Sequence, residues 1–469
     1  MTAVLALVIG LLGADPAALA AWGRTPGDRV ALADALARAA LPRLSTAVLT
    51  EVLVIERAQP AQVSRALDRY PLSLRGEPPI DRVLAALAEA PTAGLNESRI
   101  ALRGFLVGQA LLVTGEPTAA LRQLGRVPPG SPAYAPARYL MGVARITPPL
   151  SDLKAAATHF REAIIEAESS AQAPRRVVGQ ARRLALLGLA RLSFEVGNNE
   201  VALYYDRQLP RRAPERVEAN FEAAWAHLLR GDLPRALGAV HGARSPDEPH
   251  PDQAELHLVA GAALMGLCQY ERGRWELDAL QSRYLAHLEA VEQAALAVSE
   301  GANPRKLLGA AGGLPEAVRD ALRADPRVAS ALADEAALTD ELSRVEAIAT
   351  DRGVDLSLVT ARGVTLLARE GARVTAAVGH TVTDMATNWR RLSDARDELL
   401  VDLLEAEGSA LETAIEGRRE GAAEAAGDAQ QAIALGEDWQ RWEVDATWWP
   451  DELGDYRSTL PARCGEARP

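Results

Sequence analysis

The chain has 469 residues, a formal net charge of −12, 48% hydrophobic residues and 24% charged residues. This composition is typical of a soluble, folded protein that is long enough for two or three domains or for one long solenoid. The acidic balance argues against a nucleic-acid-binding protein and against anionic membranes as the main partner. Because aromatic residues are few and Ala, Leu, Arg and Glu are frequent, we expect a helical fold.

The N-terminus carries a short apolar run at residues 3–12, followed by Ala18-Leu19-Ala20. The run is too short to cross a bilayer, and small-x-small is typical of a signal-peptide cleavage site. We therefore predict a signal peptide over residues 1–20 and a periplasmic protein. No Lys or Arg precedes the run, which leaves open the first core helix of a cytoplasmic protein.

Residues 21–95 contain four segments with helical periodicity, separated by Pro and Gly. These segments are 28–41, 46–58, 60–70 and 79–90. We expect this region to form atypical first repeats or a helical cap.

Residues 96–285 carry a recurring spacing: a small residue, a helix-ending residue seven positions later, and a second small residue after five more. Its copies are Gly108/Gly115/Ala120, Ala190/Gly197/Ala202, Ala224/Gly231/Ala236 and Gly261/Cys268/Gly273. Small residues let two helices cross closely, and Gly can adopt the left-handed conformation that ends a helix. A further copy is predicted over 133–166, beginning at Gly142. Each such two-helix unit must stack on neighbours to bury its apolar faces.

This pattern, with 34 residues between its second and third copies, resembles the tetratricopeptide repeat. The family implies a right-handed α-superhelix whose first helices line a partner-binding groove. The departures are Gly104, where the family has a bulky aromatic residue, and Cys268, which replaces the turn glycine. The alternative is that the aromatic residues only pack the core. By this resemblance the groove residues would be Phe105, Gln109, Arg191, Phe194, Trp225 and Leu228.

The C-terminal part changes character. A Gly- and Pro-containing helical connection is predicted over 286–326, and a hairpin of long helices over 327–437, broken at 351–353. One apolar stripe follows three- and four-residue steps, as in a coiled coil. It comprises Val378, Val382, Met385, Trp389, Leu392, Leu399 and Leu403. The stripe is interpreted as intramolecular core, or alternatively as a dimerisation or partner-docking arm.

Residues 438–469 form an aromatic tail that contains Trp439, Trp442, Trp448 and Trp449. Because exposed aromatic patches mark contacts, we expect the tail to pack back on the protein. Its ending is similar to that of exported repeat proteins in the cell envelopes of gliding deltaproteobacteria. Together with the expected export, this resemblance suggests a disulfide between Cys268 and Cys464, the two cysteines of the chain; the alternative is two free thiols.

The sequence shows no motif for chemistry: no HExxH, no phosphate loop and no nucleophile elbow. We therefore predict no catalytic, cofactor-binding or metal-binding residue. The expected function is that of a non-catalytic scaffold, which binds other proteins or peptides within a cell-envelope complex. It would bind no nucleic acid and would not insert in a membrane. Alternatives are a cytoplasmic regulatory adaptor and a self-assembling protein that forms a homodimer through the long helices.

Overall fold

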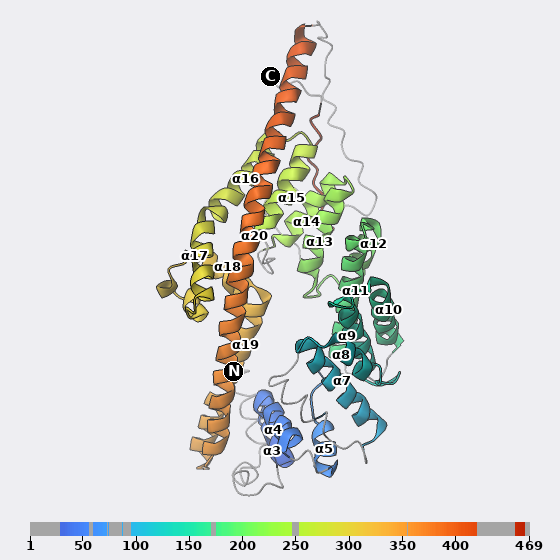
Figure 1. The fold of residues 1–469 in the computed structure, drawn as a ribbon, viewed down its shortest axis with the longest axis vertical. Helices are drawn as coiled ribbons and strands as arrows, with labels where there is room; N and C mark the ends of the chain where they lie inside the picture. Colours follow the sequence, from blue (N-terminus) through green and yellow to red (C-terminus); the bar gives the residue numbers. More distant parts are fainter. Residues whose placement is uncertain are drawn as a thin grey trace. The chain divides into compact units, whose positions relative to one another are not determined.

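The computed structural model describes residues 29–55, 60–72, 74, 87, 95–169, 175–245, 253–353, 355–419 and 455–464. Within these ranges all regular structure is helical and no strand occurs, which confirms the predicted all-α class (Figure 1). The predicted signal peptide and the four tail tryptophans lie outside the described residues.

The chain divides into two compact units, and each is built from two stretches of sequence. Unit 1 comprises Met1–Leu189 and Ala331–Arg373, and unit 2 comprises Ala190–Ser330 and Val374–Pro469. Three helices, α11 (Arg175–Glu195), α19 (Pro326–Arg352) and α20 (Ser357–Arg419), contribute residues to both units. The boundaries therefore cut across both the predicted repeat region and the predicted long-helix region.

Unit 1 is built from helical hairpins in which α3 packs on α4, α7 on α8 and α9 on α10. A carboxylate from the C-terminal stretch holds the start of α4, since Glu341 accepts hydrogen bonds from the Arg43 and Leu44 amides at 3.0 Å each. These amides have no partner inside their own helix. The helices of this unit are α3 (Arg29–Arg38), α4 (Pro42–Ile55), α5 (Pro60–Leu67), α7 (Glu97–Val113), α8 (Pro117–Leu124), α9 (Tyr134–Ile146), α10 (Leu153–Ser169) and most of α19 (Pro326–Arg352).

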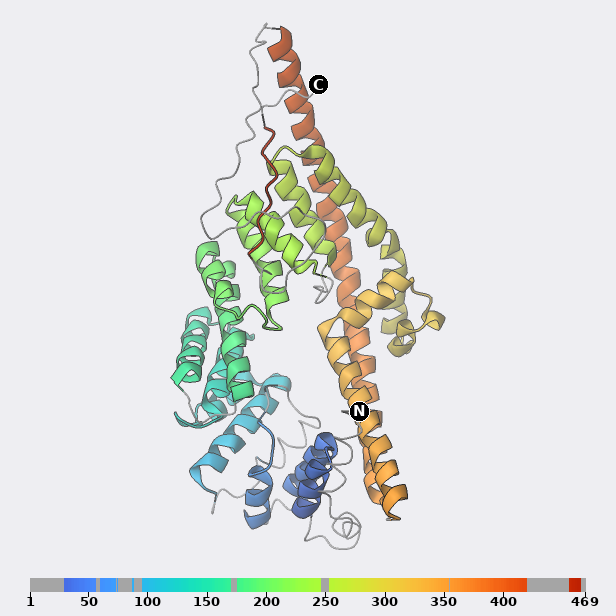
Figure 2. The same cartoon turned by 180° about the vertical axis from the view of Figure 1, so that it is seen from behind.

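Unit 2 continues the hairpins, with α13 packed on α14 and α15 on α16. Neighbouring hairpins touch as well, because α15 contacts both α13 and α14 (Figures 1 and 2). The helices are α12 (Asn199–Arg207), α13 (Arg216–Leu229), α14 (Leu233–Ala243), α15 (Gln253–Gly266), α16 (Tyr270–Arg283), α17 (Leu288–Ser299) and α18 (Glu316–Ala324), with short 3₁₀ helices η2 (Leu285–His287), η3 (Pro304–Leu308) and η4 (Ala310–Gly312).

The recurring spacing has the physical basis that the sequence predicted. The residue that ends each first helix has a positive φ: +80° at Gly115, +76° at Gly197, +73° at Gly231 and +55° at Cys268. Gly adopts this conformation without a steric cost, whereas Cys268 does so against its usual preference. The same four hairpins are therefore closed by one turn geometry, including the hairpin in which cysteine replaces glycine.

The small residues lie where the paired helices cross. A Cβ at Gly108 would lie 2.5 Å from Leu124, and a Cβ at Gly273 would lie 3.5 Å from the Gly261 carbonyl oxygen. In the further copy, a Cβ at Gly142 would come within 2.4 Å of the Phe160 ring, and a Cβ at Gly188 within 2.9 Å of the same ring. Phe160 is 1% exposed, so this ring fills the space that two glycines leave between α9, α10 and α11.

The long helices are separated where the sequence predicted, because α19 ends at Arg352 and α20 begins at Ser357. In unit 1 they run antiparallel, since Leu342 borders Gly363 and Asp334 pairs with Arg373. In unit 2, Val378, Val382, Trp389, Leu392 and Leu403 of the predicted stripe are buried. The interpretation of the stripe as intramolecular core therefore holds for these residues.

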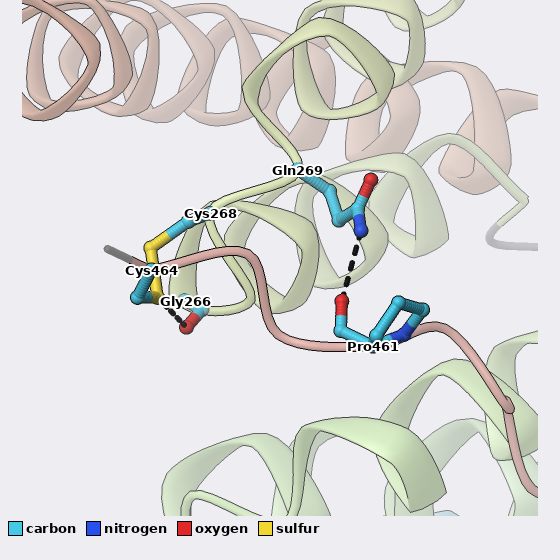
Figure 3. Close-up of a disulfide and its surroundings, with 5 residues drawn as sticks. All are labelled: Gly266, Cys268, Gln269, Pro461 and Cys464. Atoms are coloured by element: carbon cyan, nitrogen blue, oxygen red, sulfur yellow. Dashed lines mark hydrogen bonds between the residues drawn. A yellow bond between two sulfur atoms is a disulfide. The ribbon is translucent and has the colours of Figure 1, made fainter. Parts of the chain in front are cut away.

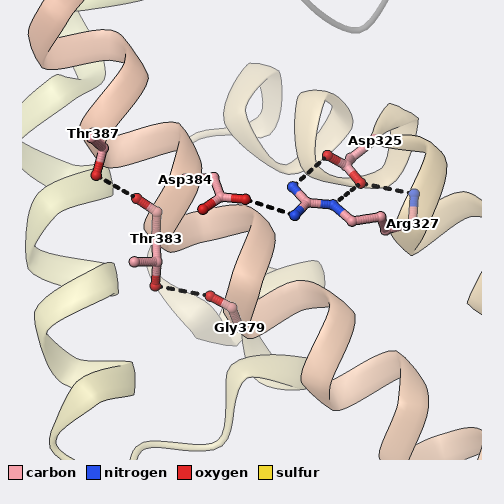
Figure 4. A network of polar contacts seen from close by, with 6 residues as sticks. All are labelled: Asp325, Arg327, Gly379, Thr383, Asp384 and Thr387. Carbon is pink, nitrogen blue, oxygen red and sulfur yellow. Dashed lines mark hydrogen bonds and ion pairs between the residues drawn. The ribbon is translucent and has the colours of Figure 1, made fainter. Parts of the chain in front are cut away.

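A polar network ties the start of α19 to α20 in unit 2 (Figure 4). Arg327 donates to both oxygens of Asp325 and, through Nη1, to Asp384 Oδ2 at 2.6 Å. On the same helix as Asp384, the Thr383 and Thr387 hydroxyls donate to the carbonyls of Gly379 and Thr383. These hydroxyls are thus satisfied by their own helix, and Arg327 is the link between the two elements.

We predict that Gly142→Ala destabilises the protein by about 1–3 kcal/mol, because the added methyl group overlaps the Phe160 ring in a closely packed crossing. The matched control is Gly179→Ala in α11, where the new Cβ meets only Arg183 Nη1 at 3.6 Å. The control is expected to be neutral or stabilising by up to about 1 kcal/mol from helix propensity. Urea unfolding of the two variants measures this difference, and equal stabilities would contradict the role given to Gly142.

Candidate functional site

The structure places the six predicted groove residues in two different environments. Phe105 is 0% exposed and Gln109 is 5% exposed, both inside unit 1. Their assignment to a partner groove is therefore corrected: these positions of α7 face the core, where Phe105 packs among the buried side chains. Arg191 is exposed and Phe194, Trp225 and Leu228 are half-buried, all of them in unit 2.

We call the surface formed by Arg191, Phe194, Glu222, Trp225 and Leu228 the first-helix face. Arg191 of α11 donates to Glu222 of α13 with an Nε–Oε1 distance of 2.5 Å, and it also donates to Glu218. The offset from Arg191 to Glu222 is 31 residues, and the same offset separates Phe194 from Trp225. Trp225 and Leu228 rest on a small apolar core that includes Ala224, Val240 and Val259.

The sequence reasoning missed the acidic part of this face. Glu218 and Glu222 are four residues apart and so share one side of α13, where both meet Arg191. Two features of the sequence could have indicated these carboxylates: their four-residue spacing, and the 31-residue offset from Arg191 to Glu222. The resulting face presents an arginine and two carboxylates beside half-buried aromatic side chains, a combination common at protein interfaces.

A buried carboxyl group lies close to the face. Asp206 at the end of α12 is 3% exposed, and its Oδ1 atom has no hydrogen-bond partner among the described residues. Burial and, to a smaller extent, the nearby Glu222 carboxylate together raise the pKa of Asp206 to about 8, against the opposing effects of Arg216 and Arg191. Asp206 is therefore protonated at neutral pH, and the charge of the surface depends on Arg191, Glu218 and Glu222.

Arg244, His257 and Glu276 join three consecutive helices of unit 2 in one polar cluster. Arg244 at the end of α14 binds both oxygens of Glu276 in α16, at 3.1 and 2.8 Å, and His257 Nδ1 in α15 lies 2.5 Å from Glu276 Oε2. Burial opposes ionisation of Glu276, but hydrogen bonds from His257 and Arg244 outweigh it and hold its pKa at about 2. Burial lowers the pKa of His257.

The side chains of this cluster pair with one another, and two of them are buried. His257 is 4% and Glu276 is 7% exposed, and both oxygens of Glu276 are occupied by partners from the chain. Its role is to fix α14, α15 and α16 together. In the part of the chain that the structure describes, no group of three or more His, Cys, Asp or Glu side chains is arranged to hold a metal ion. Among those residues, no helix is both long and apolar enough to span a bilayer.

A second surface of unit 2, formed by α14 and the α15–α16 turn, is covered by another segment of the chain. Residues 455–464, which we call the strap, run in an extended conformation along α14 and the α15–α16 turn (Figure 2). The Ser458 amide donates to the Pro234 carbonyl at 2.9 Å, and the Tyr456 ring meets His241 edge to face at 4.7 Å. The Tyr456 carbonyl lies so close to Gly238 that a Cβ there would be 1.8 Å away.

The far end of the strap is held by a disulfide between Cys464 and Cys268, as the sequence analysis predicted (Figure 3). Beside it, Gln269 Nε2 donates to the Pro461 carbonyl at 2.9 Å, and the Arg463 amide donates to the Leu267 carbonyl at 2.9 Å. The Cys464 sulfur lies 3.8 Å from the Gly266 carbonyl oxygen. The two cysteines are 196 residues apart in the sequence, so the disulfide joins the strap covalently to the last hairpin.

A scan against protein-family models finds no match to this sequence, and a search of curated proteins finds no significant match either.

We predict that Gly238→Ala releases the strap from α14, because the new methyl group occupies the position of the Tyr456 carbonyl. The strap should then lose about two backbone hydrogen bonds. As a result, dithiothreitol should reduce the disulfide at least about tenfold faster. Tryptic cleavage at Arg457 should accelerate in parallel, whereas helix content should not fall, since Ala favours helix. Gly179→Ala is the matched control, and a wild-type reduction rate in Gly238→Ala would contradict the contact.

We predict that Asp206 makes stability fall as pH rises from about 4 to about 8. Over this window folded Asp206 keeps a proton that the unfolded chain has released, so each pH unit costs up to about 1.4 kcal/mol. Asp206→Asn should abolish that loss and should be more stable than the wild type at pH 8. Urea unfolding at pH 5 and pH 8 measures the effect, with the exposed Asp340→Asn as control. Parallel pH dependence in wild type and Asp206→Asn would refute it.

Proposed function

We propose that this protein is a non-catalytic scaffold that binds other proteins or peptides through the first-helix face of unit 2. The observation that carries the proposal is the pairing of Arg191 with Glu218 and Glu222 beside the half-buried Phe194 and Trp225. Partly exposed aromatic and arginine side chains on rigid helices are the residues that dominate binding energy in protein interfaces. A surface of this kind recognises shape and charge and needs no reactive group.

We propose further that the hairpins form a tetratricopeptide-like solenoid. The shared turn geometry at Gly115, Gly197, Gly231 and Cys268 supports this assignment, as do the close crossings of small residues. So does the contact of α13 with α15, the first helices of consecutive hairpins. In such an arrangement the first helices line one continuous concave surface, on which an extended peptide or a partner helix can bind.

The proposed place of action is the periplasm, within a cell-envelope complex. The disulfide between Cys268 and Cys464 supports an oxidising compartment, since glutathione and thioredoxin keep thiols reduced in the cytosol. The apolar run at residues 3–12 also supports export, because such a run is typical of a signal peptide. A cytoplasmic regulatory adaptor and a self-assembling structural protein are the alternatives, and the test below separates them from the proposal.

The test is a cross-linked pull-down of the full-length tagged protein from fractionated native cells, with mass spectrometry of the captured proteins. Wild type is compared with the double variant Arg191→Ala/Trp225→Ala, which removes the exposed cation and one aromatic anchor of the first-helix face. The matched control is Tyr204→Ala/Trp275→Ala, which removes two side chains that are each 60% exposed on second helices.

We predict that stoichiometric envelope partners accompany wild type and the control variant, and that their recovery falls at least about tenfold with Arg191→Ala/Trp225→Ala. Equal recovery with all three proteins would contradict the first-helix face as the binding surface. Recovery from the cytoplasmic fraction would favour the adaptor, and recovery of the bait alone would favour self-assembly.

A further inference from the structure

The C-terminal third of α20 carries an apolar stripe that the packing of unit 2 leaves uncovered. Val401 is 53%, Leu404 49%, Leu411 45% and Ile415 51% exposed. With Gly408 between them, these residues follow steps of three, four, three and four, the spacing of one coiled-coil seam. Apart from the backbone of α20 itself, no atom of the described residues lies within 4 Å of the position that a Cβ at Gly408 would occupy. The last turns of α20 extend beyond α15 and α16 (Figures 1 and 2).

The stripe is distinct from the face that α20 uses for its own packing. Leu403 is 0% exposed and contacts the position of Gly273, and Glu407 pairs with Arg274 of α16. The centre of the stripe is rotated by about 120° around the helix axis from Leu403. Intramolecular packing therefore covers one side of the helix and leaves a second apolar side for another occupant.

The acidic residues along the stripe indicate which kind of helix could bind there. Residues 397–416 contain seven acidic residues and no basic residue. Glu398, Glu405 and Glu412 recur every seven residues along one border of the stripe, and all three are exposed. Among the described residues none of them forms an ion pair. An apolar seam bordered by a row of unpaired carboxylates matches a helix that carries Lys or Arg at heptad spacing.

Two other occupants are disfavoured by the same charges. A second copy in antiparallel orientation would bring these glutamate rows together, and a parallel copy would place Glu412 opposite Glu407. Residues 420–454 of this chain contain nine acidic residues and one arginine, so this segment also brings like charge. Like charges across a seam act against pairing, and they select against both self-association and self-coverage.

We propose that the α20 stripe is the docking site for a basic amphipathic helix of another protein. The scaffold would then have two contact surfaces in unit 2, the first-helix face and the α20 stripe. The biological role of this site rests on the proposed function, but binding to it does not, because the stripe shares no residue with the first-helix face. Docking would cover Val401, Leu404, Leu411 and Ile415 and would pair basic side chains with Glu398, Glu405 and Glu412.

The test uses two synthetic three-heptad helical peptides that share leucine at the seam positions. One carries lysine at the flanking positions and the other carries glutamate, and binding to the full-length oxidised protein is measured by fluorescence anisotropy at low and high salt. The variants are Leu404→Asp/Leu411→Asp, Glu405→Arg/Glu412→Arg and Asp402→Arg. Asp402 is exposed on the side of the same helix turn away from the stripe, which makes Asp402→Arg the matched charge control.

We expect the lysine peptide to bind wild type and the Asp402→Arg variant, and to weaken with salt. Its affinity should fall at least about tenfold with Leu404→Asp/Leu411→Asp, and Glu405→Arg/Glu412→Arg should switch preference to the glutamate peptide. Arg191→Ala/Trp225→Ala should bind as wild type does, which keeps a failure here separate from a failure of the first-helix face.

Three results would overturn the proposal. The first is equal affinity for the two peptides, or no binding of the lysine peptide. The second is a loss of binding caused equally by Asp402→Arg and by Glu405→Arg/Glu412→Arg. The third is a wild-type dimer in sedimentation velocity that Leu404→Asp/Leu411→Asp dissociates, since that result assigns the stripe to a second copy.

Discussion

The close crossing of paired helices through small residues is the constraint on which this structure depends. At Gly108, Gly261 and Gly273 no side chain separates the helices, and leucine side chains such as Leu124 fill the remaining space. The left-handed turn after each first helix then returns the chain at the distance the crossing needs. A hairpin built this way has more apolar surface than it can bury alone, so it packs against its neighbours, as α15 does against α13 and α14.

In unit 2, α20 and the strap cover surfaces that the hairpins leave exposed. Leu399 and Leu403 of α20 lie against Gly261 and Gly273 of the last hairpin of unit 2, and the strap crosses α14 and is joined to the α15–α16 turn by the disulfide. The strap covers part of α14 and of the α15–α16 turn. The two proposed partner surfaces, the first-helix face and the exposed stripe at the end of α20, lie outside the strap's contacts.

Several of these features could be predicted from the sequence because they follow a period. The turn positions, the small-residue crossings and the buried stripe all repeat at helical or hairpin spacing. The burial of Phe105 and Gln109 could not be predicted in this way, because which side of a first helix meets the core depends on the register of the next hairpin. The path of the strap follows no period. The sequence predicted the disulfide at its far end, whereas its contact with α14 was signalled only by Gly238, a glycine inside a helix that the repeat spacing does not require.

Photo-cross-linking in living cells can show whether the first-helix face of unit 2 contacts a partner protein. A benzoylphenylalanine is placed at position 225 and, separately, at the exposed second-helix position 204. We expect one discrete cross-linked partner band from position 225 and none from position 204. Equal bands from both positions, or no band from position 225 while the protein is folded and oxidised, would contradict it.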